Sequence, residues 1–564
     1  MLDKFAIANA LREIGQLLDL KAELGGAPAD RFKARAYVGG ARAVEQLRED
    51  IGELVRAGRL TEAKGIGDAL AKHIAELYET GASPLLEKMR SELPPGALEL
   101  AEVPHLGLRK MRALHEALGI ASVAELEAAC LAGKVRDVKG FGKKTEQKIL
   151  QGIAESRQVE ERLLLVDAEE VADRLVAFLA EGEGVQHAAI AGDIRRAAET
   201  VDGIDVVVTS TDAKSALDRF ALFGAVAEVI ERGDDFAVAR LGGGARARIT
   251  VAPPDVAGLA LFRATGSADH VAEVEALAEE SKAVLATTSE TALYASLGMQ
   301  MVAPELREGL GEVAAARKGE LVDDLVTLAD LQGLVHCHTQ YSDGKNTIEE
   351  MARAADALGM KYITITDHSP AAHYAGGVEV DRLKRQWDEI DRVQESVKVK
   401  ILRGTESDIL DSGALDYPDA ILEKMDVVIA SVHSKMKMDE DAMTQRLVAA
   451  MRQPVFKIWG HALGRLLQRR APFACRVEEV LDAVAESRAA IEINGDPYRL
   501  DMEPRWIRAA RTRDIRFTIS TDAHSTRALG NVRFGVGIAR RGGVRRGEVL
   551  NTLDAQAFAA AVRP

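Results

Sequence analysis

The pattern of apolar and polar positions changes character twice along the chain. Amphipathic helical periodicity extends to about residue 185 and predicts a series of helices. A charged run from Glu305 to Asp324 is typical of a connector between folded parts. Between these two segments, short apolar runs predict strands at Ala188–Ala191, Ile204–Val208, Ala237–Leu241 and Ile249–Ala252.

From Leu331 onward, short apolar runs alternate with helical segments such as Ile348–Leu358 and Asp381–Ser396. Strands that alternate with helices form a parallel sheet. Roughly seven such units in about 230 residues predict a closed α/β barrel rather than an open sheet. The expected strands are Leu334–Cys337, Tyr362–Thr366, Val399–Arg403, Val427–Val432, Lys457–Gly460, Ala490–Asn494 and Phe517–Ser520.

Length and composition bound the class of protein. A chain of 564 residues is long enough for three or four domains, and 47% hydrophobic with 29% charged residues is a globular balance. No apolar run reaches the roughly 18 residues of a membrane span, and the N-terminus reads as an amphipathic helix rather than a signal peptide. Three widely spaced cysteines, Cys130, Cys337 and Cys475, fit a reducing cytoplasm and exclude a disulfide framework.

The net charge of −15 argues against a nucleic-acid binder when the chain is taken as a whole. The average hides basic islands, however. Residues 31–48 carry five basic side chains against Glu45 alone, and residues 499–546 carry twelve arginines against four acids. Nucleic acid therefore remains an expected partner.

A glycine-flanked apolar residue recurs between helical segments at residues 63–68, 103–108 and 138–143. A single copy would be an ordinary turn between helices, but three copies resemble the helix-hairpin-helix DNA-binding motif. In that motif the glycines let the backbone approach a phosphate, and the amides of the following helix donate to it. The resemblance implies contact with DNA, independent of sequence, through Gly65, Gly67, Gly107, Gly140, Gly142 and Lys143.

The segment from Gly192 to Asp205, followed by the strand Val206–Val208, resembles the palm signature of family X DNA polymerases. Residues 264–267 and 294–309 are similar to the bacterial branch of that family, so the resemblance covers residues 1–320. It implies three carboxylates that hold two Mg²⁺ or Mn²⁺ ions for nucleotidyl transfer. It also implies a deoxyribose-phosphate lyase lysine, at a position where this chain has His73.

The palm motif departs from the family pattern at its catalytic acids. Asp205 stays in register, but Asp202 stands one residue from its expected place and would point to the other face of a strand. Arg248 occupies the position of the third aspartate, and a guanidinium does not ligate Mg²⁺. We expect impaired or absent polymerase activity. Two alternatives stay open: a metal site rebuilt with Asp202, Asp193 or Asp234, or a scaffold that holds DNA or a nucleotide. The scaffold would use Gly192, Arg195 and Arg196.

Histidines gather in the last 230 or so residues. Seven of the 12 fall between His336 and His524, and six of those stand at the ends of expected strands. The ends of parallel strands converge on one face of a barrel. One strand, Ile491–Asn494, offers Asn494 in place of a His or an acid. Mixed imidazole and carboxylate groups favour Mn²⁺, Zn²⁺ or Fe²⁺ over Ca²⁺ or Mg²⁺ alone, so the sequence predicts a metal cluster.

This layout resembles the polymerase and histidinol phosphatase (PHP) domain, a metal-dependent phosphoesterase. The resemblance implies up to three Mn²⁺ or Zn²⁺ ions. It also suggests Arg465 as a phosphate clamp and Asp367 as a group that orients a ligand. Cys337 is expected to point into the core. The implied metal ligands are His336, His338, Asp343, His368, Glu406, His433, His461, Asp522 and His524.

Together the motifs predict a multidomain α+β and α/β protein with the order of a bacterial family X DNA polymerase. We expect a monomeric cytoplasmic, nucleoid-associated DNA repair protein without a membrane segment. The expected domains are a helix-hairpin-helix domain (1–90), fingers with two further hairpins (91–160), a palm (161–255), a thumb (256–320), a linker (321–332) and a distorted α/β barrel of the PHP type (333–564).

The leading functional hypothesis is a metal-dependent 3′–5′ exonuclease or 3′-end phosphoesterase that acts on gapped or nicked DNA, with abasic-site cleavage as a further family activity. A gap-filling polymerase that uses dNTPs through a rebuilt palm is the main alternative. A non-enzymatic DNA scaffold would leave the histidine-rich barrel unexplained. A small-molecule phosphatase would leave the three hairpins unexplained.

Overall fold

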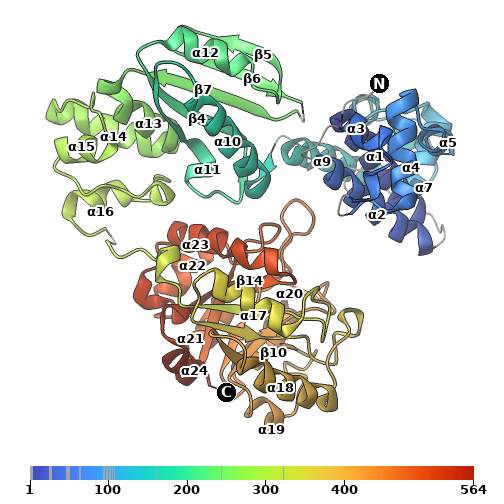
Figure 1. Ribbon diagram of the computed structural model, residues 1–564, viewed down its shortest axis with the longest axis vertical. Coiled ribbons are helices and arrows are strands. Elements are labelled where there is room, and N and C mark those ends of the chain that lie inside the picture. The colour runs from blue at the N-terminus through green and yellow to red at the C-terminus, as the bar shows by residue number, and fades with distance from the viewer. Residues whose placement is uncertain are drawn as a thin grey trace. The chain divides into compact units, whose positions relative to one another are not determined.

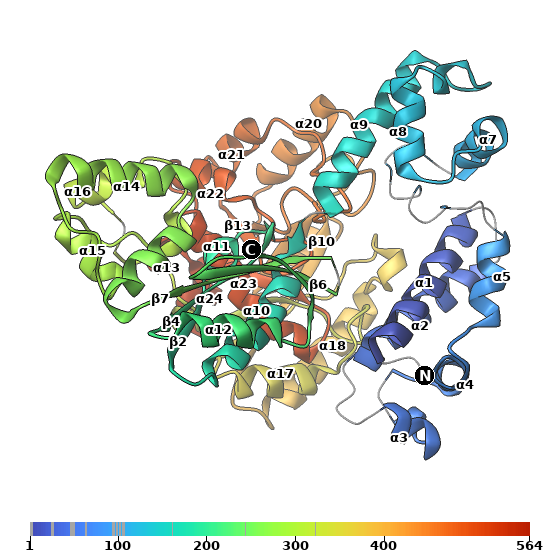
Figure 2. The ribbon, with the colours of Figure 1, turned by 90° about the horizontal axis from the view of Figure 1, so that it is seen from above.

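The protein forms two compact units, Met1–Glu161 and Arg162–Pro564. Their helices and strands are labelled in Figure 1, and Figure 2 gives a second view. No described helix is long and apolar enough to cross a membrane. The computed structural model describes residues 4–23, 28–45, 51–62, 65–92, 96, 100, 103, 106, 108–160, 162–242, 244–321 and 323–563.

The first unit consists of helices around one apolar core. Fully buried side chains such as Ile7, Leu11 and Ile74 form this core, and they recur at the helical spacing expected from the sequence. The helices are α1 (Lys4–Glu23), α2 (Pro28–Glu45), α3 (Ile51–Arg56), η1 (Leu60–Glu62), α4 (Asp68–Thr80), α5 (Pro84–Glu92), α7 (Leu108–Leu118), α8 (Val123–Leu131), η2 (Val135–Asp137) and α9 (Lys143–Glu160).

The second unit begins with a five-stranded sheet of order β2-β4-β7-β6-β5, in which β4 and β7 are parallel. Alternate residues such as Ile204, Val206 and Ile249 share a buried cluster with α10 and α12. The elements are β1 (Leu163–Leu164), α10 (Leu165–Ala180), β2 (Val185–Ile190), α11 (Gly192–Arg195), β3 (Thr200–Val201), β4 (Gly203–Ser210), α12 (Ala213–Ala221), β5 (Val226–Arg232), β6 (Phe236–Leu241) and β7 (Arg246–Ala252).

A small helical subdomain follows the sheet. Its core includes Phe262, Val274 and Tyr294, and the buried His270 lies 2.6 Å from Glu312 through Nδ1 and Oε1. The helices are η3 (Pro254–Val256), α13 (Ala257–Thr265), α14 (Ala268–Ser281), α15 (Glu290–Ser296), η4 (Pro304–Leu306) and α16 (Glu312–Lys318).

The rest of the chain forms a closed barrel of seven parallel strands in the order β10-β11-β12-β13-β14-β8-β9. The strands are β8 (Gly333–Cys337), β9 (Tyr362–Ile365), β10 (Lys400–Asp408), β11 (Val427–Ser431), β12 (Lys457–Trp459), β13 (Ala489–Asn494) and β14 (Phe517–Ala523). The helices are η5 (Leu328–Asp330), α17 (Ile348–Ala357), η6 (His373–Ala375), α18 (Val380–Gln394), α19 (Asp419–Leu422), α20 (Glu440–Met451), α21 (Val477–Ala485), α22 (Pro504–Arg511), η7 (Thr526–Asn531), α23 (Val532–Arg541), η8 (Arg546–Glu548), η9 (Leu550–Thr552) and α24 (Ala555–Val562).

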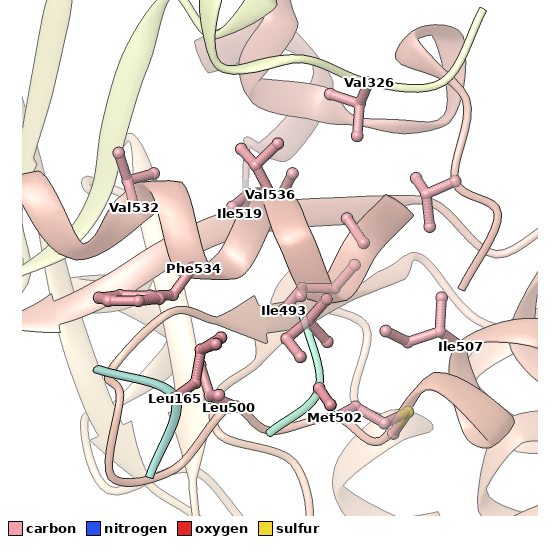
Figure 3. Close-up of a cluster of buried hydrophobic side chains, with 14 of the residues drawn as sticks. Leu165, Val326, Ile493, Leu500, Met502, Ile507, Ile519, Val532, Phe534 and Val536 are labelled. Carbon is pink, nitrogen blue, oxygen red and sulfur yellow. The ribbon is translucent and has the colours of Figure 1, made fainter. Parts of the chain in front are cut away.

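The sheet and the barrel share one buried apolar cluster within the second unit. Leu165 at the start of α10 lies beside Leu500 and near Phe534 of the barrel (Figure 3). Ion pairs also join the barrel to the rest of the unit. Arg465 pairs with Glu199 and Arg533 with Glu169 of the sheet region, and Arg540 and Arg541 pair with Glu305 and Glu308 of the helical subdomain. Several arginines of the basic island at 499–546 therefore pair with acids of the same unit.

The closed barrel confirms the predicted α/β fold class of the C-terminal region. Every expected barrel strand is present, although β10 continues to Asp408 and so includes Glu406. The sequence pattern did not predict β5, an edge strand whose residues are mostly exposed and in which Glu228 and Glu231 interrupt the apolar positions.

Candidate metal centre

All nine predicted ligands come together at the carboxyl ends of the barrel strands. His336 lies within β8, Glu406 within β10 and Asp522 within β14, and the other six follow strand ends or lie in the loops after them. Three overlapping groups each place their ligand atoms within 4.8 Å of one another. The groups are His338, Asp343, His368 and His524; His336, His338, Glu406 and Asp522; and His368, Glu406 and His433.

Glu406 is the hub of the cluster. Its Oε1 lies 2.9 Å from Nε2 of His461, 3.2 Å from Nε2 of His433 and 3.3 Å from Nε2 of His336. Its Oε2 lies 2.9 Å from Nδ1 of His368. One carboxylate is therefore shared by ligands from four other strands, as a bridging ligand between metal ions requires.

Two further carboxylates complete the arrangement. Oδ1 of Asp522 lies 3.0 Å from Nε2 of His338 and 3.4 Å from Nε2 of His336. Oδ1 of Asp343 lies 3.1 Å from Nε2 of His524, at the more open edge of the cluster. The donors form three pockets of mixed nitrogen and oxygen atoms, which is the donor chemistry that Mn²⁺, Zn²⁺ and Fe²⁺ accept.

The buried donor atoms fit bound metal ions. Among the described residues, these atoms are shielded from solvent and make no hydrogen bond of good geometry, although several lie within ion-pair distance of one another. Buried polar atoms in this state cost free energy unless a ligand satisfies them. They are Nε2 of His336, both ring nitrogens of His338, Nδ1 of His368, both carboxylate oxygens of Glu406 and Oδ1 of Asp522.

Two carboxylates that the sequence did not single out hold the ligand histidines in place. Oε1 of Glu492 lies 2.5 Å from Nδ1 of His336, and Oδ1 of Asp408 lies 2.5 Å from Nδ1 of His433. Each leaves Nε2 of its histidine aimed at the cluster, as metal-ligand histidines require. Alternation could have found them, since Glu492 shares a strand face with Asn494, and Asp408 shares one with Glu406.

The electrostatics of the cluster come from charges packed in a buried space. Burial disfavours the charged form of His336, but Glu492, Glu406 and Asp522 outweigh it and hold the pKa of His336 well above its ordinary value. For His433 the carboxylates of Glu406 and Asp408 likewise overcome burial and raise the pKa to about 10.

His338 behaves in the opposite way. Burial and the neighbouring histidines lower the pKa of His338 to about 3, so its ring is neutral and ready to ligate at neutral pH. The same crowding of histidines holds the pKa of Glu406 well below its usual range, against the effect of burial.

Three ligands have left-handed backbone conformations. The φ angles are +66° at His336, +25° at His461 and +50° at Asp522. Such conformations cost roughly 1–3 kcal/mol each for residues other than glycine, and they persist where surrounding contacts hold them. The strained positions coincide with the strand ends that aim these side chains into the barrel mouth.

Other residues named from the sequence lie beside the cluster. Asp367 is buried and accepts hydrogen bonds from Thr339, Ser342 and Gln386, so it organises the loop that leads to Asp343 rather than a ligand histidine. Cys337 is fully buried in the core, and Asn494 is buried next to Glu492.

Arg465 points away from the cluster. Its guanidinium donates to the carbonyl oxygens of Arg499 and Leu500 and pairs with Glu199 of the palm. This placement corrects the suggestion that Arg465 clamps a phosphate at the metal centre. The arginine beside the cluster is Arg499, whose Nε lies 3.6 Å from Oδ2 of Asp522.

The palm residues have a different arrangement. Asp205 on β4 pairs in register with Arg248 on the parallel strand β7, so an arginine faces the predicted catalytic acid. Asp202 lies between β3 and β4 with an exposed side chain that forms an ion pair with Arg162. Among the described palm residues, no three acids or histidines come close enough to hold a metal ion.

The two candidate nucleotide-binding arginines are engaged by carboxylates. Arg195 forms a two-point ion pair with Glu290, with distances of 3.0 and 2.6 Å. Arg196 pairs with Asp193 and, at 3.1 Å, with Glu308. Gly192 has a φ of +63°, and a Cβ there would meet Oδ2 of Asp205 at 2.4 Å, so this glycine lets Asp205 pack closely.

The hairpin glycines adopt the conformations that their motif needs. Gly65 and Gly140 have φ angles of +97° and +92°, and Gly67 and Gly142 immediately precede α4 and α9. Lys143 begins α9 with an exposed side chain. Gly107 of the second hairpin lies outside the described residues.

His73, at the position implied for the lyase lysine, lies on α4. Its ring is 5.7 Å from the ring of Tyr37, and its Nδ1 is 3.7 Å from Oε2 of Glu76. An imidazole in this place cannot form the imine that lyase chemistry requires.

Sequence comparisons identify three domains. The PHP domain family matches residues 335–496, a helix-hairpin-helix domain matches residues 3–83, and a SAM-like helix-hairpin-helix tandem matches residues 97–155. The barrel alone resembles a probable phosphatase of Thermoanaerobacter sp. (strain X514), at 30% identity over 38% of this chain and 89% of that protein. A probable phosphatase of Caldanaerobacter subterraneus is 32% identical over 34% of this chain and 74% of its own length.

One relative matches along the full length. The DNA polymerase/3′-5′ exonuclease PolX of Bacillus subtilis (strain 168) is 31% identical over 98% of this chain and 98% of its own. With both hairpin domains and the PHP domain in the same order, the chain belongs to the bacterial family X DNA polymerases that carry a C-terminal PHP domain.

Proposed function

We propose that this protein is a DNA-repair nuclease that removes nucleotides or blocking groups from 3′ ends at gaps and nicks, and that its palm does not synthesise DNA. The observation that carries the proposal is the contrast between the two sites. In the barrel, eight candidate ligands form overlapping groups and His461 lies beside Glu406 of those groups, whereas the palm has Arg248 in register with its remaining acid, Asp205.

The chemistry of the barrel supports phosphoester hydrolysis. His336, His338, Asp343, His368, Glu406, His433, His461, Asp522 and His524 would hold the metal ions, which we infer to be Mn²⁺ or Zn²⁺ from the donor set. Bound metals supply a nucleophilic hydroxide and stabilise charge on the leaving oxygen.

The protein groups around the ligands keep the site ready. Glu492 and Asp408 fix the rings of His336 and His433 so that Nε2 of each faces the cluster. Arg499 brings a positive charge to the edge of the site, 3.6 Å from Asp522, where a phosphate anion would otherwise meet the acidic ligands. The Glu406 side chain is fully buried, so its carboxylate is held in one place by the surrounding side chains.

The state of the palm supports the loss of polymerase activity. Two-metal nucleotidyl transfer needs several carboxylates around the metals, and a guanidinium repels a cation. Asp202, the acid that could rebuild the site, forms an ion pair with Arg162. Arg195 and Arg196 are held by Glu290 and Glu308, so neither is free for a triphosphate.

The hairpins supply the hold on DNA in this proposal. Gly65 and Gly140 bring the backbone into the form in which helix-hairpin-helix motifs contact phosphates. The exposed Lys143 adds a cation at the start of α9. The relative from Bacillus subtilis bears the name of an exonuclease as well as a polymerase, which agrees with the nuclease half of the proposal.

The test uses a labelled duplex with a one-nucleotide gap, Mn²⁺, and either no dNTPs or all four. We expect the wild-type protein to shorten the 3′ strand in both conditions and His336→Ala to abolish shortening while DNA binding persists. Extension of the primer that disappears in Asp205→Ala would overturn the palm proposal. Shortening that survives in His336→Ala would overturn the assignment to the barrel.

A further inference from the structure

Three arginines form a row on one face of the palm sheet, on the side away from α10 and α12. Arg248 on β7 stands beside Asp205 on β4, and Arg246, two residues earlier on β7, stands beside Gly203. Arg240 on β6 pairs directly with Arg246 in the antiparallel register. Because paired residues of neighbouring strands point to the same side, the three guanidinium groups share one face.

The guanidinium groups of this row make no ion pairs with the acids of the described residues. All three are exposed, and within the part of the chain that the structure describes, Arg240 and Arg246 have neither an ion pair nor a hydrogen bond through their side chains. Arg248 lies over an aromatic ring, its guanidinium carbon 4.7 Å from the centre of Phe236, and makes no ion pair with the residues that the structure describes. Like charges placed directly opposite one another, as Arg240 and Arg246 are, destabilise a sheet, so an anionic ligand would relieve a cost present in the free protein.

The acids near the row do not neutralise it. Glu228 and Glu231 on the edge strand β5 stand in register with Arg240 and Val238, at the outer side of the row. On the inner side Asp205 is largely buried, and burial raises the pKa of its carboxyl above the ordinary value, even though nearby arginines oppose the shift. No ion pair joins any of these three acids to the row among the described residues.

A cavity of about 530 Å³ adjoins the inner end of the row. Its lining includes Asp205 and Arg248 of the sheet, Asp235 of the turn before β6, and Leu259 and Arg263 of α13. The row therefore leads from the exposed edge of the sheet into a recess at the position where the family's metal site would be.

We propose that Arg240, Arg246 and Arg248 bind the phosphodiester backbone of DNA without a metal ion, so that the palm holds the substrate strand for the nuclease. The inference rests on the proposed function, in which DNA is the substrate. In a catalytic palm, metal cations bound by carboxylates neutralise the phosphate. In this palm the positive charge would come from arginine side chains, whose guanidinium groups bind phosphate in two-point contacts.

The geometry of the row favours a strand over a free nucleotide. Arg246 and Arg248 are two residues apart on one strand and hence about 6.6 Å apart along it. Arginines spread along a strand match successive phosphates of an extended backbone better than the compact phosphates of a nucleoside triphosphate. Contacts to the backbone would not depend on base sequence and would weaken as salt rises.

The test measures binding of the full-length protein to the gapped duplex in EDTA, by fluorescence anisotropy over a series of KCl concentrations. EDTA prevents digestion and removes any contribution from metals. We expect the triple variant R240Q/R246Q/R248Q to bind at least about tenfold more weakly at low salt and to lower the slope of log K against log salt by about two to three. Because all three side chains are exposed, the variant should fold, which circular dichroism would verify.

The matched control replaces three exposed cations elsewhere in the same unit, as R174Q/R385Q/K398Q. An equal loss of affinity in this control would attribute the effect to overall charge and overturn the proposal, as would unchanged affinity and slope in the R240Q/R246Q/R248Q protein. A parallel titration with dATP in EDTA separates the two phosphate sources. Loss of dATP binding with DNA affinity intact would assign the row to a nucleotide and overturn the backbone assignment.

This measurement is independent of the nuclease assay. A protein that digests DNA through His336 but gains nothing from the arginines would refute the palm inference and leave the proposed function in place. A protein that binds DNA through the arginines but does not digest it would refute the proposed function and leave the palm inference in place.

Discussion

Glu492 and His336 lie in the barrel with Oε1 of the glutamate 2.5 Å from Nδ1 of the histidine, and both side chains are fully buried. The same carboxylate accepts hydrogen bonds from Ser520 and from the backbone amide of His461. It therefore contacts β8, β14 and the loop after β12, three segments that carry candidate metal ligands. We therefore expect Glu492 to be a positioning residue, which would act on the proposed hydrolysis through His336.

Replacement of Glu492 by Gln should weaken metal binding about 10- to 100-fold, because partners of this kind hold a ligand histidine in its tautomer and orientation. Calorimetric titration of the stripped protein with Mn²⁺ would measure the change. Nuclease activity should recover at high Mn²⁺, which distinguishes a positioning role from a role in the chemical step. Glu479→Gln, an exposed change on α21, is the control and should leave the affinity unchanged.

Metal ions should stabilise the second unit. The buried donor atoms of His336, His338 and Glu406 lack hydrogen-bond partners, so a ligand that binds only the folded state relieves their cost. At a metal concentration about 100 times the dissociation constant, the stabilisation is about 2.7 kcal/mol per site. Thermal unfolding of EDTA-treated protein should shift upward on addition of Mn²⁺.

The same titration on His338→Ala provides the control. This variant loses a ligand common to two of the three donor groups, so most of the Mn²⁺-dependent shift should vanish. A shift as large as that of the wild type would mean that Mn²⁺ acts at another place.

The convergence of the candidate metal ligands could be predicted from the sequence because they stand at or close to the ends of apolar runs, where a parallel barrel brings its strands together. Glu492 and Asp408 lie within strands and were missed, because the prediction considered only the residues at the ends of the apolar runs. Their alternation with Asn494 and Glu406 was the signal that could have identified them. The direction of the Asp202 side chain could not be predicted, for a different reason. Its direction depends on the break between β3 and β4 and on the distant Arg162, and neither follows from local spacing.

The pairing of Glu312 with His270 should make the thumb sensitive to acid. Burial opposes ionisation of Glu312, but hydrogen bonds from His270 and from the amides of Gly309 and Leu310 prevail and lower its pKa to about 2. A carboxyl with a lowered pKa stabilises the fold above its unfolded pKa, and this contribution disappears as pH falls toward 2.

The contribution of Glu312 at neutral pH is up to about 3 kcal/mol. Glu312→Gln should therefore lower the unfolding temperature of the thumb at pH 7 and bring the variant and the wild type closer together as pH falls from 5 to 3. Melts followed at several pH values would test this. A constant difference across that range would show that packing, rather than charge, accounts for the loss. Nuclease activity of the variant at low temperature should be unchanged, because Glu312 lies outside the metal centre.

If the palm binds no metal, as we propose, Asp205 should be dispensable for activity. Its pKa is raised, chiefly by burial and by Asp193, so the folded state disfavours its charge. A raised carboxyl pKa makes the charged group a cost to folding above its unfolded pKa, and the cost vanishes at lower pH. Asp205→Asn should therefore raise the unfolding temperature at pH 7, give little change near pH 4, and leave 3′-end shortening in Mn²⁺ at the wild-type rate. Loss of stability at pH 7 together with loss of Mn²⁺-dependent activity would mean instead that the carboxylate of Asp205 still serves a metal ion, despite the arginine that faces it.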